Sequence, residues 1–396
     1  MSIFGLVLIL LSCCLSPLSG DGGDSVWFRE QKVVGAGDEG CYWRIPALLS
    51  LRDGTLLMAC DRRKNNEADL PEDIDAVLIR SSDGGQTWGK TMTIAEGKGK
   101  GRGYGDVALV ECANDDVVCT FAGGNGFWLS TEKEPISTYI CISKDGGNTW
   151  SSPQDVTNVI WGSKSENPDG HQYKGSFNAS GNGLRLKSGK YEGRIMFVAA
   201  LCRKSEWAAD NYVLYSDDNG TSWKISQQAY RGGDEAKVVE LPDGRILMSV
   251  RQTGERGYAV SSDGGETWEH QGRWTDMRTN ACNGDLMIVE LDKGEKVLLQ
   301  ALPNSMEREN VSLFVSRDNG ITWPEVVKIV DGPSVYSSMT QLTDGTIGMM
   351  VEKVVDGHFE LWYLNFTKAW LTEKLRKESN RNDNKLKNTN PTKKNE

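Results

Sequence analysis

The sequence is poor in residues that bind metals. Its 396 residues include only three histidines, at positions 171, 270 and 358, and no Cys-x-x-Cys pair. A zinc site built from cysteine and histidine, or an HExxH metalloprotease motif, therefore has no set of ligands. We expect a protein that requires neither a metal nor another cofactor.

The sequence also lacks an excess of positive charge. Lysine and arginine number 45 against 55 aspartates and glutamates, which gives a net charge of −10. Nucleic acids and anionic membranes are bound by basic surfaces. We therefore expect no nucleic-acid partner.

Long hydrophobic runs are missing after the first residues. The apolar run at 3–11 is too short to span a bilayer, and small residues follow it up to Gly20. This pattern predicts a signal peptide over residues 1–20 and a secreted, extracellular protein without an integral membrane segment. An alternative is that Cys13 is a lipid-attachment cysteine, which would make the protein a surface-anchored lipoprotein.

Cysteines do not suggest a disulfide framework. Without Cys13 and Cys14, seven remain, and an odd number excludes complete internal pairing. We interpret most of them as small buried apolar residues. Cys112 and Cys119, which flank an expected hairpin turn, are the best candidates for a disulfide.

One octet is written five times. It reads SSDGGQTW at 81–88 and returns with small changes at 143–150, 216–223, 261–268 and 316–323. Repeats at this spacing, with short aliphatic runs and Asp-Gly turns between them, predict an all-β propeller with four strands in each blade. The five octets and the strands expected at 338–366 together predict six blades, the last closed by strands from near the N-terminus.

The octet itself is best explained as a structural turn. Its aspartate can accept hydrogen bonds from turn amides, its glycine can adopt a positive φ, and its tryptophan can pack between sheets. Function is therefore expected in the residues that do not repeat. We assign residues 21–371 to the propeller, and residues 372–396, which have almost no apolar residues, to a disordered basic tail.

Three arginines stand out from this repetitive background. Arg44 lies inside the apolar stretch CYWRIPALL, Arg251 ends an expected strand, and Arg308 precedes one. On different blades of a propeller they could converge on the axis, where guanidinium groups would match a carboxylate. Taken singly, each is better explained as a surface residue.

The stretch from Tyr42 to Pro46 resembles the Tyr/Phe-Arg-Ile-Pro motif of the sialidase (neuraminidase) family, and the octets resemble the Asp boxes of that family. The resemblance covers roughly residues 28–370. Trp43, inserted between the aromatic residue and the arginine, is the one departure from the motif.

The resemblance implies a carboxylate clamp of three arginines. It falls on Arg44, Arg251 and Arg308, with Glu352 as the carboxylate that steadies Arg44. A site of this kind would be locally positive although the whole chain is acidic.

The resemblance also implies the groups that perform the reaction. Tyr336 corresponds to a tyrosine nucleophile, and Glu235 to its partner glutamate. Asp69 corresponds to the acid/base aspartate, and Arg63 to an additional arginine that contacts substrate, with Arg62 as the alternative. Three other aspartates compete with Asp69 for its role, namely Asp61, Asp73 and Asp75.

The resemblance implies a retaining exo-α-sialidase that acts on sialylated glycoconjugates, and we expect it to be a monomer. A neutral tyrosine suits this chemistry because sialic acid carries a carboxylate on its anomeric carbon, which would repel a carboxylate nucleophile. Specificity candidates are Asp106, Phe127 and Trp128, each equally well explained by packing. The alternatives are a trans-sialidase, an intramolecular trans-sialidase, and a noncatalytic propeller that binds sialoglycans.

Overall fold

The computed structural model describes residues 25–291 and 294–389, with side chains described as far as residue 380. The predicted signal peptide at 1–20 and Cys13 lie outside the described residues. The described part of the chain contains no helix that is long and apolar enough to cross a membrane.

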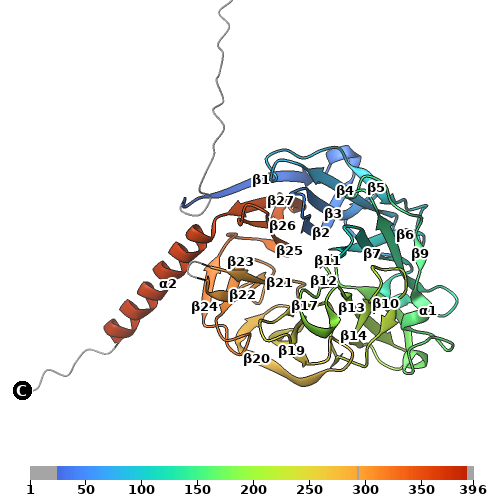
Figure 1. Ribbon diagram of the computed structural model, residues 1–396. Helices are drawn as coiled ribbons and strands as arrows, with labels where there is room; N and C mark the ends of the chain where they lie inside the picture. Colours follow the sequence, from blue (N-terminus) through green and yellow to red (C-terminus); the bar gives the residue numbers. More distant parts are fainter. Residues whose placement is uncertain (1–24, 292–293, 390–396) are drawn as a thin grey trace, which may run out of the picture.

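The described residues form six sheets that surround a common axis, so the predicted six-bladed β-propeller is confirmed (Figure 1). Blade 1 contains β2 (Tyr42–Ser50), β3 (Leu56–Arg63), β4 (Ile74–Ser81) and β5 (Met92–Ala95). Blade 2 contains β6 (Gly103–Glu111), β7 (Val117–Gly124), β8 (Ile136–Ser143) and β9 (Gln154–Asp155), and β11 (Gly181–Asn182) pairs in parallel with β6. Blade 3 contains β10 (Tyr173–Asn178), β13 (Ile195–Arg203), β14 (Ala209–Ser216) and β15 (Lys224–Ile225), with the short strands β12 (Leu184–Arg185) and β16 (Tyr230–Arg231).

The remaining blades repeat the plan of four antiparallel strands. Blade 4 contains β17 (Ala236–Glu240), β18 (Ile246–Val250), β19 (Gly254–Ser261) and β20 (Glu269–Thr279). Blade 5 contains β21 (Asp285–Glu290), β22 (Lys296–Pro303), β23 (Val311–Ser316) and β24 (Glu325–Lys328). Blade 6 contains β25 (Ser334–Gln341), β26 (Ile347–Val355), β27 (His358–Phe366) and, from the other end of the chain, β1 (Phe28–Gly35). The short helices are η1 (Asp38–Gly40), η2 (Phe127–Leu129), α1 (Thr157–Ile160), η3 (Gly170–Gln172) and η4 (Gly189–Tyr191).

The propeller is closed by strand β1. It pairs antiparallel with β27, from Phe28 opposite Phe366 to Gly35 opposite Glu360. The last blade therefore takes its outer strand from near the N-terminus, as the sequence predicts. This pairing joins the two ends of the blade cycle by backbone hydrogen bonds.

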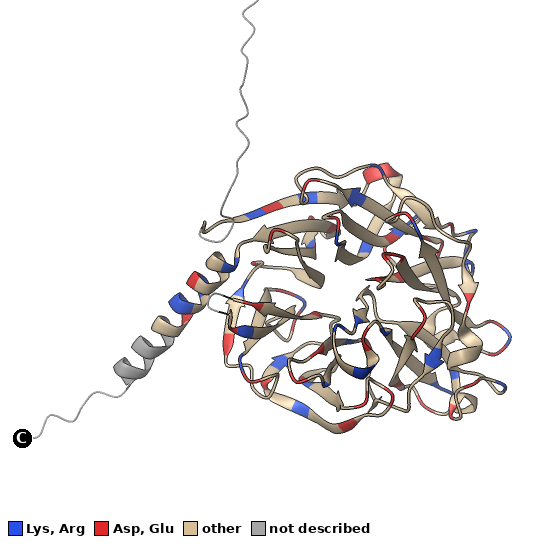
Figure 2. Ribbon diagram, in the orientation of Figure 1, with Lys and Arg blue, Asp and Glu red and all other residues tan. Residues whose placement is uncertain are grey.

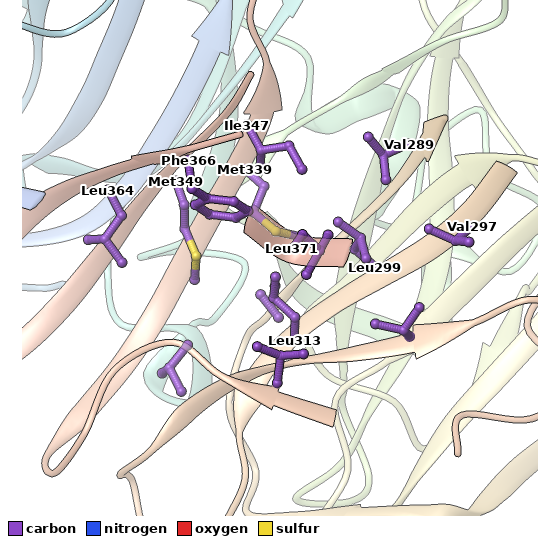
Figure 3. Close-up of a cluster of buried hydrophobic side chains, with 14 of the residues drawn as sticks. Val289, Val297, Leu299, Leu313, Met339, Ile347, Met349, Leu364, Phe366 and Leu371 are labelled. Atoms are coloured by element: carbon purple, nitrogen blue, oxygen red, sulfur yellow. The ribbon is translucent and has the colours of Figure 1, made fainter. Parts of the chain in front are cut away.

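The hydrophobic core lies between neighbouring blades. One cluster combines Val289 and Leu299 of blade 5 with Met349 and Leu364 of blade 6 (Figure 3). Because each sheet buries both of its faces in this way, its strands read as nearly continuous aliphatic runs.

The repeated octets form turns between the third and fourth strands of their blades. In the first, Ser81 Oγ donates to Asp83 Oδ1 at 2.8 Å, and the same carboxylate oxygen accepts from the Thr87 amide at 2.9 Å. Gly85 has a φ of 83°, and a Cβ there would lie 2.2 Å from the Tyr363 ring of the neighbouring blade. Trp88 packs edge-on against that ring, with centroids 5.3 Å apart. The octet therefore contributes a turn and a contact between blades.

The predicted disulfide between Cys112 and Cys119 is wrong. Both cysteines are buried free thiols. Cys112 packs in the cluster that contains Val110, whereas Cys119 packs in the cluster that contains Val117, so their side chains serve different faces of blade 2. The broader interpretation of cysteines as buried apolar residues is confirmed for six of the seven, because Cys41 is only half-buried.

The predicted disorder from Thr372 is wrong for residues 372–389, which belong to α2 (Lys368–Thr389). Leu371 and Leu375 are buried against the cluster shared by blades 5 and 6, and Trp370 stacks on Phe28 of β1 at 4.9 Å. Burying each of these leucines contributes about 1.5–3 kcal/mol. From this anchored first half, α2 extends away from the propeller (Figure 1), and its turns as far as residue 380 carry charges of both signs (Figure 2).

Candidate active site

The candidate residues gather at the end of the propeller opposite the octet turns. Strand β3 ends at this face with Arg63, and β4 then runs back toward its octet. Tyr336 lies near the start of β25, Glu235 directly before β17, and Arg251 directly after β18. The innermost strands of the blades surround the axis (Figure 1), so residues far apart in the chain become neighbours.

Arg44 is held by Glu352 across the boundary between blades 1 and 6. Its Nε and Nη2 donate to the two carboxylate oxygens at 2.8 and 3.1 Å, although the residues lie 308 positions apart. The Ile45 amide donates to the same carboxylate at 2.8 Å. Ile45 has a φ of 60°, and the pairing of β2 with β3 shifts at this point, which turns Arg44 toward the axis. Burial disfavours the charged form of Glu352, but the Arg44 guanidinium prevails and lowers the pKa of its carboxyl group.

Tyr336 is hydrogen-bonded to both a carboxylate and a guanidinium. Its hydroxyl donates to Glu235 Oε2 at 2.7 Å and accepts from Arg251 Nη1 at 2.9 Å. Arg251 Nη1 also donates to Glu235 Oε2. Burial, and then the charge of Glu235, raise the pKa of Tyr336, so the phenol is neutral at neutral pH. Burial also raises the pKa of Glu235, which brings this carboxylate closer to the basicity that proton transfer requires.

Three guanidinium groups surround the phenol. The Cζ atoms of Arg44 and Arg308 lie 5.9 and 5.8 Å from the centroid of the Tyr336 ring, and Arg251 touches its hydroxyl. Arg308 is exposed and donates one hydrogen bond, to the Ala281 carbonyl at 3.1 Å. Arg44 also stacks on Phe359, with its Cζ 3.7 Å from the ring centroid. Arg44 pairs with Glu352, and Arg251 with Glu235 and Asp234, so Arg308 is the guanidinium of the three for which no ion pair is found among the described residues. Three guanidiniums that converge on one pit are suited to a carboxylate ligand.

Asp69 lies at the rim of this pit on the loop between β3 and β4. Arg63 Nη2 is 2.7 Å from Asp69 Oδ1, and the Asp69 side chain is 76% exposed. Partial desolvation by the surrounding protein opposes its ionisation, but the charges of Arg63 and Arg44 together lower the pKa of Asp69. The carboxylate is therefore accessible to a ligand and lies within the field of Arg44.

The competing aspartates have other partners. Asp61 is buried and lies 2.9 Å from Arg63, and burial raises its pKa to about 6. Asp73 pairs with Lys64, and Asp75 with Lys64 and Arg62. Of the four aspartates, only Asp69 combines contact with Arg63 and access from the pit. The same contacts favour Arg63 over Arg62 as the arginine of the site.

The specificity candidates lie in two places. Asp106 has a φ of 58° beside an irregularity in the pairing of β6 with β7, and its amide donates to Asp61 at 2.9 Å. Burial and the charges of Asp61 and Asp69 raise the pKa of Asp106. Asp106 therefore lies close to the two aspartates that pair with Arg63. Trp128 lies farther out on η2, where it stacks on Trp207 at 4.9 Å and contacts Phe127 edge-on at 4.8 Å.

Several residues of the site carry no signal in the sequence. Phe359 and Cys282 pack around Tyr336, and Arg256 and Lys237 are buried in blade 4 near Glu235. Each is a single residue in an ordinary strand or turn. Their importance follows only from neighbours that the fold supplies.

The fold and the pit together define an Asp-box propeller with a cationic pit beside a paired tyrosine and glutamate. Residues 67–349 match the family described as BNR repeat-like domain. The chain belongs to the sialidase family of BNR-repeat propellers.

Curated relatives agree with this assignment. The chain is 29% identical over 371 residues to a sialidase of Micromonospora viridifaciens, covering 88% of this chain and 55% of that protein. It is 29% identical over 345 residues to a sialidase of Bacteroides fragilis, covering 80% and 61% of the two chains. The chain thus spans little more than half the length of these relatives.

Solved structures give the same fold. A Hadza microbial sialidase superposes with a TM-score of 0.74 at 26% identity, covering 85% of this chain and 68% of that one. An intramolecular trans-sialidase from Ruminococcus gnavus, solved with oseltamivir carboxylate, superposes with a TM-score of 0.71 at 20% identity, covering 83% and 95%. The second likeness concerns the fold alone.

Proposed function

We propose that the chain is a retaining exo-α-sialidase, which hydrolyses terminal sialic acid from glycoproteins, glycolipids and oligosaccharides through a tyrosyl-enzyme intermediate. The observation that carries this proposal is the 2.7 Å hydrogen bond from Tyr336 to Glu235 beside three guanidinium groups. A sialoglycan-binding module would need the guanidiniums but not a buried phenol paired with a carboxylate.

Substrate binding would begin with the carboxylate of sialic acid. Arg44, Arg251 and Arg308 would grip it and place the anomeric carbon over the Tyr336 hydroxyl. The guanidiniums would also offset the charge that keeps a carboxylate nucleophile away from this carbon. Arg44 needs little reorganisation, because Glu352 already fixes it by two hydrogen bonds.

Glycosyl transfer to the enzyme would then use two proton transfers. Tyr336 oxygen bonds to the anomeric carbon while its proton passes to Glu235, and the glycosidic bond breaks as protonated Asp69 gives its proton to the leaving oxygen. Asp69 has a lowered pKa in the ligand-free protein, so the bound substrate must raise it by excluding water and engaging Arg44 and Arg63.

Hydrolysis would reverse the roles. The Asp69 carboxylate removes a proton from water as the water oxygen attacks the anomeric carbon, and the bond to Tyr336 breaks as Glu235 returns the proton to the phenolate. Two displacements at one carbon retain its configuration. If a hydroxyl of another sugar or of the bound sialic acid replaced the water, the product would be a transferred or an anhydro sugar.

Product analysis separates these possibilities. The chain is incubated with sialyllactose, with and without an excess of an acceptor sugar, and products are followed by proton NMR from the first turnovers. The proposal requires free sialic acid released first as the α-anomer. An anhydro product or a sialylated acceptor would establish one of the transferase alternatives, and binding without any product would establish the noncatalytic one.

Tyr336→Phe is the matched control for this assay. The variant removes only the nucleophilic oxygen, so turnover should fall by roughly 10³-fold or more. Binding of sialic acid should persist because the guanidiniums remain. Turnover equal to that of the parent chain would exclude Tyr336 as the nucleophile.

A further inference from the structure

Blade 4 buries a guanidinium that forms no ion pair with a carboxylate in the part of the chain that the structure describes. Arg256 on β19 has none of its surface exposed. Its Nε donates to Ser249 Oγ at 2.8 Å and its Nη1 to the Cys282 carbonyl at 2.9 Å, whereas Nη2 has no hydrogen-bond partner among the described residues. Burial lowers the pKa of Arg256 to about 10, so the group is still a cation at neutral pH.

Strand register places Arg256 beside the catalytic pair. The amide of Arg251 donates to the Glu235 carbonyl at 2.8 Å. Val250 of β18 pairs with Gly257 of β19, so the residues that follow this pair toward the loop, Arg251 and Arg256, lie opposite each other. Glu235, Arg251 and Arg256 therefore follow one another across β17, β18 and β19. The bond from Arg256 to Ser249 shows that its side chain lies on the face that Ser249 shares with Arg251.

Lys237 adds a second buried cation to this face. It is two residues after Glu235 on β17, it pairs across the strands with Ser249, and it is 2% exposed. Its Nζ also has no hydrogen-bond partner among the described residues, and the carboxylates whose charges act on it are Asp285 of blade 5 and then Glu235. Oε1 of Glu235 is likewise buried without a hydrogen-bond partner among the described residues, whereas Oε2 accepts hydrogen bonds from Tyr336 and Arg251.

A buried cation without an ion pair is costly, and groups perturbed in this way cluster at functional sites. We propose that Arg256 and Lys237 are positioning residues that form a cationic layer beneath Glu235 and keep it ionised, so that it can accept the proton of Tyr336. The inference rests on the proposed function. In this proposal the cations of blade 4 keep Glu235 ionised, whereas Arg44 and Arg308 bind the carboxylate of the substrate.

Other charged groups also face Glu235 and set the background against which these cations act. They come from its own blade and from blades 2, 5 and 6: Arg251, Asp234, Asp106, Cys282 and Tyr336. Arg251 donates a hydrogen bond to only one carboxylate oxygen of Glu235, Oε2. The negative charges of Asp234 and Asp106 disfavour the ionised form of Glu235. Arg256 and Lys237 add positive charge to this balance, because each interacts with the charge of Glu235.

The test is the titration of Glu235 in Arg256→Gln, read in two ways. The acidic limb of kcat/KM against pH is measured on an aryl sialoside, and the carboxyl ¹³C resonance of Glu235, assigned with Glu235→Gln, is titrated directly. Both midpoints should rise by about 1 pH unit, because a nearby cation that favoured the carboxylate is lost. Arg256→Lys, which keeps the charge, should return both midpoints close to the parent value.

Arg194→Gln is the matched structural control. Arg194 is also buried, but it pairs with Asp217 and Glu266 near the octet end of the propeller. Its loss should lower thermal stability and leave the Glu235 midpoint unchanged. If Arg256→Gln does not fold, Lys237→Met supplies the same readout, with a rise in the midpoint expected again.

The outcomes separate this inference from the proposed function. An unchanged ¹³C midpoint in a folded Arg256→Gln or Lys237→Met variant would overturn the inference, whatever the activity. A shifted midpoint in a chain that hydrolyses no sialoside would uphold the cationic layer and refute the proposed function.

Discussion

Tyr336 illustrates how much of this site depends on single contacts. Its hydroxyl has two partners, one that can take its proton and one that stabilises the oxygen it leaves behind. The motif around Arg44 could be recognised in the sequence, and it led to Tyr336, Glu235 and Glu352 by resemblance. Arg256 could not be recognised, because a lone arginine in a strand is usually a surface residue and only the register of blade 4 places it near Glu235.

Asp69 is tested by how its loss depends on the leaving group. Asp69→Asn cannot protonate a leaving oxygen, so hydrolysis of sialyllactose should fall by roughly 10²–10⁴-fold. A sialoside of an acidic phenol needs no proton on departure, and its glycosyl transfer to the enzyme should fall far less. The rates are compared by stopped-flow and steady-state kinetics.

Asp73→Asn is the control for Asp69, because Asp73 is on the same loop and pairs with Lys64. It should retain the activity of the parent chain on both substrates. Equal losses on the two substrates in Asp69→Asn would contradict its role as the acid.

Arg308 is suited to a test of binding alone. It is exposed and has one hydrogen bond to a carbonyl, so Arg308→Ala should leave the melting temperature almost unchanged. Loss of a charge-assisted contact to the substrate carboxylate, worth about 1.5–3 kcal/mol, should raise KM by roughly 10- to 100-fold. Arg245→Ala removes an exposed arginine from the turn between β17 and β18, at the opposite end of blade 4 from Arg251, and should leave KM as it was. A KM for Arg308→Ala equal to that of this control would remove Arg308 from the clamp.

At the scale of elements, the octet turns and α2 show opposite degrees of predictability. The octet could be interpreted correctly because its hydrogen bonds are local: Asp145 binds Ser143 and Thr149, two and four residues away. The anchoring of α2 could not, since Leu371 and Leu375 gain their partners from blades 5 and 6. The error over Cys112 and Cys119 has the same origin, because the faces they occupy are set by neighbouring blades.

The octets should affect stability without affecting chemistry. The side-chain and amide hydrogen bonds of Thr149 lower the pKa of Asp145 from its ordinary 3.8 to about 2. A depressed folded pKa means that the ionised carboxylate stabilises the fold above pH 4, and that this contribution is lost as the pH falls toward 2. Asp145→Asn should therefore melt a few degrees lower than the parent chain at pH 7, with a smaller gap at pH 3 and an unchanged kcat at 25 °C.

Thermal unfolding at the two pH values checks this, with Asp331→Asn as a control. Asp331 makes one exposed ion pair, to Lys328, which contributes little to stability. A gap for Asp145→Asn that widened as the pH fell, or a loss of kcat, would contradict a purely structural octet.

At the scale of the molecule, the propeller converts distance along the chain into proximity at the axis. Glu235 and Tyr336 are 101 positions apart, and Arg44 and Glu352 are 308 apart, yet each pair shares a hydrogen bond. Six blades were predictable from the spacing of five octets because each repeat is one sheet. Although the chain carries a net charge of −10, the fold gathers arginines from blades 1, 4 and 5 at one end.

The central claim is that this convergence makes Tyr336 a nucleophile, and covalent trapping tests it most directly. A 3-fluoro sialosyl fluoride has a good leaving group, and its ring fluorine slows the hydrolysis that follows. After brief incubation and acid quench, peptide mass spectrometry should find one fluorosialosyl group on Tyr336, and none in Tyr336→Phe. Release of fluoride by the parent chain without an adduct on Tyr336, or with the adduct on another residue, would contradict the account.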